Sequence, residues 1–262
     1  MDSAASEKSI IALDGWLQTP PGAYVRAWEQ ARLDELTADI FGFNAVQIGL
    51  PQIDALAANR MPRKWLAGTQ PRPLRTASGA ELRQVALTFD YAELPFASQS
   101  LDLVVLPHVL EFAAEPHQVL REVERVLRPE GQLIICGFNP ASLWGLRQVT
   151  GRITGSHFLP RDGEFISMLR LKDWLKLLNL GATQSYFGCY APACRTEKWL
   201  QRYAFMDKVG SRSWSYLGAV YMVQAVKRVK GMHLIGPAWS KKTATAPAGV
   251  PATNKRREQQ DG

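Results

Sequence analysis

The sequence predicts an α/β fold built on a doubly wound, parallel sheet, and three observations point to it. Short apolar segments alternate with amphipathic segments of helical periodicity. Each apolar segment ends at a polar or turn-forming residue, as buried strands do. Residues 87–140 hold three such segments, and a helix and a tight turn connect the last two. Sheets of this kind place their ligand at the carboxyl ends of the strands.

Two strands are predicted in the first half of this region. Residues 85–89 form an apolar segment that ends at Asp90, which puts a carboxylate at the carboxyl edge of the sheet. Residues 101–106 are apolar almost throughout, as a strand that is buried on both faces requires.

A helix, a turn and a third strand follow. Pro116 suits the first turn of a helix because its missing N–H would have no partner there. Residues 128–131, Arg-Pro-Glu-Gly, predict a tight turn, and residues 133–136 predict the third strand. Between Pro116 and the turn, one apolar face is predicted from residues at helical spacing: Val119, Leu120, Val123, Val126 and Leu127.

Several short motifs lie at fixed spacing in this region. Asp90 precedes Leu94-Pro95-Phe96, a Ser-x-Asp-x-Val pattern occupies residues 100–104, and Arg-Val-Leu-x-Pro-x-Gly occupies residues 125–131. In this combination the chain resembles the class I S-adenosylmethionine-dependent methyltransferases, specifically their type 11 family. The resemblance implies a mostly parallel, seven-stranded sheet of Rossmann-like type that ends in an antiparallel C-terminal hairpin.

The last part of the predicted sheet follows residue 165. An amphipathic helix is predicted over residues 169–178, and Asn179 and Gly181 end it. Residues 182–190 and 217–226 predict two strands, which match the hairpin of the class I sheet.

The resemblance implies S-adenosylmethionine as cofactor and assigns residues to it. Asp90 takes the position that hydrogen-bonds the adenine amine, with Tyr91 beside the ring. Leu106, Pro107 and His108 follow the fourth strand and approach the adenine or methionine half. Without the resemblance, the better interpretation of Asp90 is a residue that caps a turn at the end of a strand.

The cofactor loop departs from the family pattern. Residues 45–49 predict the first strand, and the loop that follows normally presents an acid and then three glycines at alternate positions. Gln47 replaces the acid and Gly49 is the first glycine, but Pro51 and Ile53 replace the other two. Proline has no N–H to donate and fixes its own φ, so it cannot act as a permissive glycine. We therefore expect a degenerate glycine loop.

A second departure concerns the ribose. The family places an acid at the end of the second strand, where one carboxylate accepts hydrogen bonds from both ribose hydroxyls. Residues 61–70 contain no acid, and Thr69 or Gln70 offers only a neutral substitute.

Composition indicates a soluble globular protein, with 46% hydrophobic and 21% charged residues in 262. No apolar segment is long enough to span a membrane, and the first residues, MDSAASEKS, lack the pattern of a secretory leader. We therefore expect a cytoplasmic protein. The three cysteines lack the spacing of a zinc site or a disulfide framework, so no metal is expected.

Three parts are predicted along the chain. Residues 1–40 form a helical lead-in, with helices between residues 16 and 41, and residues 41–230 form the methyltransferase-like domain, with insertions at 141–165 and 191–216. Residues 195–262 hold thirteen of the 31 Lys and Arg but only four of the 24 acids. Within this basic region, residues 240–262 predict a disordered tail, because large apolar side chains are nearly missing.

The insertion at 191–216 interleaves aromatic and basic residues. Packing of its aromatic side chains onto the sheet is the favoured interpretation, followed by a lid over an apolar, anionic substrate. Binding of single-stranded nucleic acid comes last, because no recognisable RNA-binding motif accompanies the pattern.

Two functions follow from these observations. The first is transfer of a methyl group from S-adenosylmethionine to a small, partly apolar molecule, in which the protein mainly aligns the reacting atoms. No catalytic base is assigned, since His108 and Glu111 lie in the right region but His108 fits a structural role equally well. The second is a catalytically inactive relative that serves as a binding or scaffold protein. A nucleotide-binding oxidoreductase is a distant third, since no G-x-G-x-x-G follows any strand.

Overall fold

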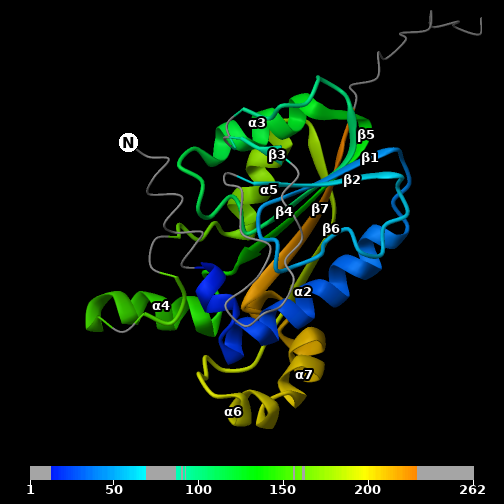
Figure 1. Ribbon diagram of the computed structural model, residues 1–262. Coiled ribbons are helices and arrows are strands. Elements are labelled where there is room, and N and C mark those ends of the chain that lie inside the picture. The colour runs from blue at the N-terminus through cyan, green and yellow to red at the C-terminus, as the bar shows by residue number, and fades with distance from the viewer. Residues whose placement is uncertain are drawn as a thin grey trace, which may run out of the picture. The chain divides into compact units, whose positions relative to one another are not determined.

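The computed structural model describes residues 13–68, 87–89, 91, 93–155, 157–160 and 163–228, all within one compact unit. These residues form seven strands: β1 (Asn44–Ile48), β2 (Arg63–Gly68), β3 (Leu87–Thr88), β4 (Leu101–Pro107), β5 (Leu127–Phe138), β6 (Leu180–Gly188) and β7 (Val220–Lys227). All seven belong to one sheet in the order β3-β2-β1-β4-β5-β7-β6 (Figure 1). The first five are parallel, whereas β7 is antiparallel to both β5 and β6. The predicted fold class is therefore confirmed.

The helices of the described residues are α2 (Pro20–Ala38), α3 (Pro116–Val126), α4 (Leu143–Thr154), α5 (Met168–Leu177), α6 (Glu197–Arg202) and α7 (Phe205–Ser213), followed by a 3₁₀ turn, η1 (Ser215–Leu217). Local sequence explains several of their ends. Thr19 caps α2, and its hydroxyl oxygen accepts the Gly22 N–H. Ser142 caps α4 in the same way, and α4 ends at Gly155, whose φ of 74° suits glycine.

The two faces of the sheet bury two apolar clusters. One cluster joins alternate residues of β1, β4 and β5 to α2 and to the helical turn at residues 13–17. The other joins the intervening residues of the same strands to α3 and α5 (Figure 1). This alternation follows from the two-residue period of side chains along a strand. The predicted lead-in thus contributes directly to the core.

Several predicted boundaries differ from the structure. The predicted strand at 85–89 is described only as the short β3, and residues 85 and 86 lie outside the described residues. We expected the turn at residues 128–131 to precede the third strand, which was wrong. In the structure β5 begins at Leu127 and includes these four residues. These residues form an exposed irregularity in the β4–β5 pairing, with a φ of 61° at Glu130. The strand therefore continues through the irregularity instead of starting after it.

The insertion at 191–216 differs most from its prediction. It folds into α6, α7 and η1, none of which was predicted. Most of its aromatic side chains are exposed, so the favoured interpretation, that they pack onto the sheet, was wrong for Trp199, Phe205 and Trp214. Tyr216 is largely exposed too, but its ring lies 5.5 Å from the ring of Phe187 in β6. In α5, Leu169 and Leu177 are exposed as well, although we expected them on the apolar face. The predicted tail at 240–262 lies outside the described residues.

Within the described residues, no helix is both long enough and apolar enough to cross a membrane.

Candidate functional site

The candidate site lies where β1 and β4 are neighbours. β1 pairs with β2 on one side and with β4 on the other, so the chain leaves these two central strands in opposite directions. A crevice forms outside the carboxyl ends of the strands at such a point, and ligands of doubly wound sheets bind there. Both strands end in unusual backbone. φ is 80° at Gly49, 39° at Leu50 and 52° at His108.

Gln47 shapes the loop that follows β1. Its side chain is fully buried, and its Nε2 atom donates to the carbonyl oxygens of Gly49, Leu50 and Ile53 at 3.1, 3.0 and 2.7 Å. Its Oε1 atom accepts the N–H of Ala55 at 3.0 Å. A carboxylate at this position could accept the Ala55 N–H but could not donate to three carbonyls. Gln47 is therefore the residue that holds this version of the loop closed.

The two residues that replace glycines are buried in the loop. Ile53 belongs to the apolar cluster that contains Leu13, Leu17 and Leu33, beneath α2 and the helical turn before it. Pro51 is buried too. The departure from the glycine pattern thus adds apolar packing between the loop and the N-terminal helices.

The loop leaves little room for a side chain at Gly49. A Cβ atom on Gly49 would lie 3.1 Å from Cγ2 of Val109 and 3.5 Å from the hydroxyl oxygen of Tyr91. Tyr91 is buried among the residues of β1 and β4, so the structure brings Gly49 and Tyr91 together. Asp90, Thr69 and Gln70 lie outside the described residues.

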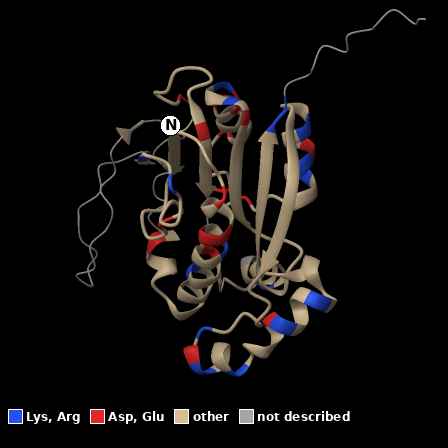
Figure 2. Cartoon of the chain, turned by 90° about the vertical axis from the view of Figure 1, so that its right-hand side faces the viewer, with Lys and Arg blue, Asp and Glu red and all other residues tan. Residues whose placement is uncertain are grey.

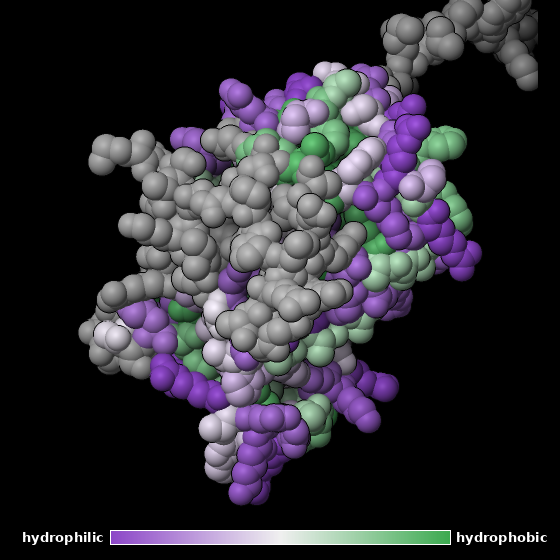
Figure 3. Space-filling model, in the orientation of Figure 1, coloured by the Kyte–Doolittle hydropathy of each residue, from purple (hydrophilic) through white to green (hydrophobic). Residues whose placement is uncertain are grey.

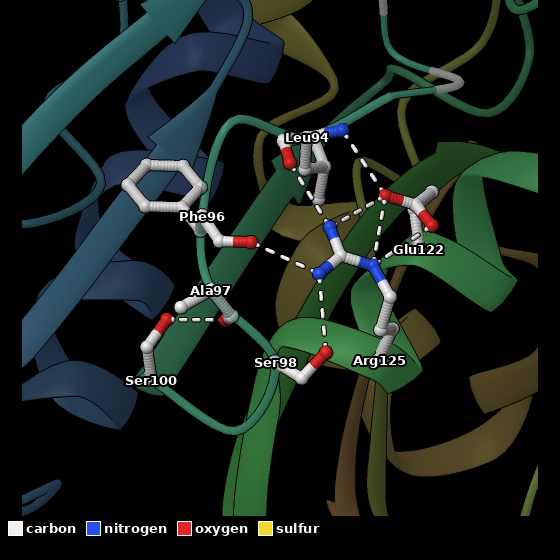
Figure 4. A network of polar contacts seen from close by, with 7 residues as sticks. All are labelled: Leu94, Phe96, Ala97, Ser98, Ser100, Glu122 and Arg125. Atoms are coloured by element: carbon white, nitrogen blue, oxygen red, sulfur yellow. Dashed lines mark hydrogen bonds and ion pairs between the residues drawn. The ribbon is translucent and has the colours of Figure 1, made fainter.

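Arg125 of α3 fixes the Leu-Pro-Phe segment that follows Tyr91 (Figure 4). Its guanidinium donates to the carbonyl oxygens of Leu94 and Phe96, both at 3.0 Å, and its Nη2 atom lies 2.8 Å from Oε2 of Glu122. The same Glu122 oxygen accepts the N–H of Leu94 at 3.2 Å. The hydrogen bonds from Arg125 lower the pKa of the Glu122 carboxyl. The spacing of the sequence motifs thus corresponds to a charged clamp that connects the segment to α3.

Asp102, the acid of the Ser-x-Asp motif, connects the starts of two strands. Its Oδ2 atom accepts the N–H groups of Phe43 at 2.8 Å and Asn44 at 2.9 Å. Partial burial raises the pKa of this carboxyl, but these two donors and Arg128 lower it further than burial raises it. The motif therefore has a structural role at the edge opposite the candidate site.

His108 lies at the carboxyl end of β4 between two buried carboxylates. Its Nδ1 atom is 2.8 Å from Oε2 of Glu111, and its Nε2 atom is 2.8 Å from Oε1 of Glu29 in α2. Glu111 also accepts the N–H of Phe138. The second oxygen of Glu29 is buried and has no hydrogen-bond partner among the described residues. Within the same residues, no group of His, Cys, Asp or Glu has the arrangement of a metal site.

The two carboxylates decide the protonation state of His108. Burial by itself lowers the pKa of the imidazole, but the charges of Glu29 and Glu111 outweigh burial and raise it to about 10. Burial raises the pKa of Glu111, although His108 and the Phe138 N–H oppose that shift. His108 is therefore an imidazolium that donates to both carboxylates at neutral pH.

Aromatic side chains cover the end of β5 beside this triad. The Phe138 ring lies 4.3 Å from the His108 ring and 5.5 Å from the Trp16 ring, measured between centroids. Trp144 continues the group, 6.2 Å from Trp16 and 6.3 Å from Tyr24. A cavity of about 480 Å³ lies between the start of α2 and α6, and Tyr24 lines it. His108, Glu29 and Glu111 thus lie next to a mainly aromatic region.

Of the six predicted cofactor residues, the structure brings four to the carboxyl ends of β1 and β4: Gln47, Gly49, Tyr91 and His108. Leu106 is fully buried in β4, and its side chain packs in the cluster with α3 and α5. Sequence reasoning missed Glu29, because nothing in the helical pattern of residues 20–38 distinguishes it from a solvent-facing acid.

Comparisons with known proteins point to one family. The family model described as "Methyltransferase domain", type 11, matches residues 68–135. The uncharacterized protein YafS of Escherichia coli is 29% identical over 180 residues, which cover 68% of this chain and 70% of YafS. A malonyl-[acyl-carrier protein] O-methyltransferase of Laribacter hongkongensis is 37% identical over 86 residues, but these cover only 33% of this chain and 28% of that enzyme.

Solved structures share the fold at low sequence identity. A methyltransferase in complex with the Haloferax volcanii activator Trm112 has a TM-score of 0.58 at 19% identity, over 84% of this chain and 97% of that one. An S-adenosylmethionine-dependent methyltransferase of Thermotoga maritima has a TM-score of 0.54 at 14% identity, over 78% of this chain and 92% of that one. The chain therefore has the class I methyltransferase fold.

The cofactor of this family is S-adenosylmethionine, and two features of the described site fit it. Gly49 has a left-handed φ that suits glycine, and its missing side chain lets the loop backbone pack against Val109 at the carboxyl end of β4, where the crevice lies. Glu29 Oε2 is a buried acceptor without a partner, which a hydroxyl, an ammonium group or the sulfonium charge of the cofactor would compensate.

Proposed function

We propose that this chain, which carries a methyltransferase domain of the type 11 family on a class I fold, transfers a methyl group from S-adenosylmethionine to a small, partly apolar acceptor. The observation that carries the proposal is the cluster of left-handed backbone at Gly49, Leu50 and His108, where β1 and β4 end side by side. Strained backbone of this kind is costly for residues other than glycine and gathers at functional sites. Here it coincides with the crevice where doubly wound sheets bind ligands.

The cofactor, when bound, supplies a methyl group that its sulfonium charge already activates. The residues of this chain then bind and orient. Gln47 fixes the loop that begins at Gly49, and Asp90 and Tyr91 are proposed to hold the base. Leu106 contributes at most its backbone, because its side chain is buried in the core. Alignment of this sort can supply most of the rate enhancement of a direct displacement.

His108 is proposed to position groups rather than to accept a proton. A general base must be unprotonated at the working pH. The pKa of His108 is raised to about 10 by its two carboxylate partners, so the imidazole already carries its proton at neutral pH. Its structural roles are to attach α2 to the end of β4 and to hold Glu29 at the site.

The aromatic region beside the triad supports an acceptor that is partly apolar. Phe138 packs against the His108 ring and Trp16 packs against Phe138, and the partly exposed Trp16 offers an apolar ring, of the kind that favours flat or apolar molecules. Relatives named for malonyl-[acyl-carrier protein] and for demethylmenaquinone align over at most a third of this chain, so their acceptors are not transferred to it. The three cysteines, all free, support a reducing compartment such as the cytoplasm.

Isothermal titration calorimetry with S-adenosylmethionine and S-adenosylhomocysteine tests the proposal. We expect micromolar dissociation constants for the wild type and a loss of about fivefold or more in Asp90→Ala, since a lost hydrogen bond to a buried group weakens binding by about 1–3 kcal/mol. Glu93→Ala is the matched control, because Glu93 is an exposed acid three residues further along, and its affinity should equal that of the wild type.

The inactive scaffold is the alternative, and one observation favours it: Pro51 offers no N–H in a loop that normally donates to the cofactor. No heat of binding for either ligand at millimolar concentration would favour that alternative and refute the enzyme.

A further inference from the structure

The segment between β6 and β7 exposes aromatic and basic side chains together. We define the basic aromatic surface as the exposed residues of α6, α7 and η1 together with Trp214, which lies between α7 and η1. Phe205, Trp214 and Tyr216 are 61%, 53% and 74% exposed, and Lys198, Arg202, Lys208 and Arg212 are exposed between them. These helices lie at the lower end of the view in Figure 2, where blue positions outnumber red ones. In Figure 3 the same end is mostly purple and near-white, with a few green side chains among them.

Helix α7 has one buried face and one unpartnered face. Gly210 packs against the Tyr190 ring so closely that a Cβ atom would lie 2.4 Å from it. Asp207 accepts the Tyr24 hydroxyl at 2.5 Å and the Tyr190 N–H at 2.9 Å. The opposite face repeats at helical spacing and is exposed throughout: Phe205, Lys208, Val209 and Arg212.

Helix α6 extends this face with a stacked pair. The Trp199 and Tyr203 rings are 6.1 Å apart and 19° from parallel, and the Arg202 guanidinium lies 5.6 Å from the centre of the Trp199 ring. Tyr203 is in turn 6.5 Å from Phe205, so the aromatic side chains of the two helices are continuous. Leu200 is buried and anchors α6 to the domain.

We propose that the basic aromatic surface docks this protein onto an anionic lipid surface. Tryptophan and tyrosine suit the boundary between lipid headgroups and acyl chains, because one part of each side chain is apolar and the other is polar. Residues 195–217 carry five Lys or Arg and two acids, and one of those acids, Asp207, is engaged by Tyr24 and Tyr190. The remaining charge complements anionic headgroups, which attract each nearby basic residue.

The composition distinguishes a lipid surface from a protein partner. The cores of protein interfaces are depleted in lysine, whereas here Lys208 lies on the same exposed face as Phe205 and Val209. Both ends of the segment also have a defined place. β6 ends at Gly188 and β7 starts at Val220, opposite each other and next to Phe138 at the end of β5. The surface therefore lies at the carboxyl edge of the sheet, the edge that holds the candidate site.

Co-sedimentation of the full chain with vesicles tests the proposal. Binding to phosphatidylcholine–phosphatidylglycerol vesicles should be strong at low salt, and binding to pure phosphatidylcholine vesicles should be weak. Lys208→Glu/Arg212→Glu should weaken binding to the anionic vesicles by about tenfold or more, since each basic residue near the surface contributes a sizeable attraction. Lys172→Glu/Lys176→Glu is the matched control, with the same charge change and the same spacing on α5, and should bind like the wild type.

A second variant separates insertion from simple attraction. Phe205→Ser/Val209→Ser keeps every charge and should also weaken binding, and brominated lipids should quench the tryptophan fluorescence of the wild type more than that of Trp199→Phe. Circular dichroism confirms that each variant is folded. Equal binding of the wild type and of Lys208→Glu/Arg212→Glu would overturn the proposal and assign lipid binding to other basic residues. Binding to a single-stranded RNA oligonucleotide but not to vesicles would overturn it as well.

Discussion

The Nε2 atom of His108 lies 2.8 Å from Oε1 of Glu29, although 79 residues separate the two in the sequence. Neither side chain is exposed, and Glu111 holds the other ring nitrogen. This contact attaches the middle of α2 to the carboxyl end of β4. The helix that covers the candidate site is therefore held in place by a buried charge pair, in addition to its apolar packing.

Removal of the Glu29 charge should destabilise the fold. Glu29→Gln preserves the shape of the side chain but leaves the buried imidazolium with one carboxylate, and loss of one partner of a buried pair costs about 3–5 kcal/mol. Urea unfolding at neutral pH measures the change. Glu35→Gln on the same helix is the control, because Glu35 is largely exposed and pairs with Arg32 on the surface. Equal stability of both variants would show that the buried pair contributes nothing.

The same pair predicts how stability depends on pH. The pKa of His108 rises from 6.5 to about 10 in the folded protein, so the folded state binds this proton more tightly than the unfolded state. The stabilisation is complete below pH 6.5 and is lost as the pH rises through about 10. Wild-type stability should therefore fall across this range, and Glu29→Gln should fall less. A parallel pH dependence of the two proteins would contradict the assignment.

The loop after β1 should require an amide at position 47. Gln47→Ala should lower the free energy of unfolding by about 1–3 kcal/mol for each buried group left without a partner. Gln47→Glu should destabilise the fold more, because it places a carboxylate against the carbonyl oxygens of Gly49, Leu50 and Ile53. Hydrogen exchange of residues 49–55 reports the loosened loop directly. Gln201→Ala, at an exposed glutamine whose side chain donates to Glu197, serves as control. A stable Gln47→Glu variant would show that the loop tolerates the acid usual in the family.

Gly49→Ala should be more destabilising than Gly155→Ala. Both glycines have a left-handed φ, 80° and 74°, so both substitutions cost about 1–2 kcal/mol of backbone strain. Only at Gly49 does the new Cβ meet a neighbour, Val109, whereas nothing lies within 4 Å at Gly155. Val109→Ala should remove the steric part of the Gly49→Ala effect in a double-mutant cycle. Additive effects of Gly49→Ala and Val109→Ala would contradict the close contact.

The clamp on the Leu-Pro-Phe segment should depend on the forked guanidinium. Arg125→Lys keeps the charge but cannot bond Leu94, Phe96 and Glu122 together. We expect faster hydrogen exchange at residues 93–98 and weaker binding of S-adenosylhomocysteine, because the segment carries Tyr91 and Asp90 at its start. Arg121→Lys, one turn earlier on the exposed side of α3, should change neither measurement.

Local patterns in the sequence were enough for the central part of the fold. α3 begins at Pro116 as predicted, and the apolar segments at 45–49, 101–106 and 133–136 all lie in strands of the sheet. Each of these depends on periodicity or on a residue with one preferred place in an element. The hairpin of β6 and β7 was expected for the same reason, with ends that differ by a few residues.

The rest depended on contacts that no local pattern records. The Glu29–His108 pair joins two elements that are far apart in the sequence. It depends on how α2 packs against the end of β4, which no local pattern predicts. The helices α6 and α7 are short, Gly210 interrupts the helical pattern, and their aromatic side chains face outward. The hydrophobicity of these aromatic side chains therefore predicted burial, whereas the fold leaves them exposed.

A crystal structure with S-adenosylhomocysteine would show whether the crevice between β1 and β4 binds the cofactor. We expect a nucleoside at the carboxyl ends of β1 and β4, with its base next to Asp90 and Tyr91 and a contact to the backbone of Gly49. A crystal grown at saturating ligand, in which no ligand is bound at this crevice, would contradict it.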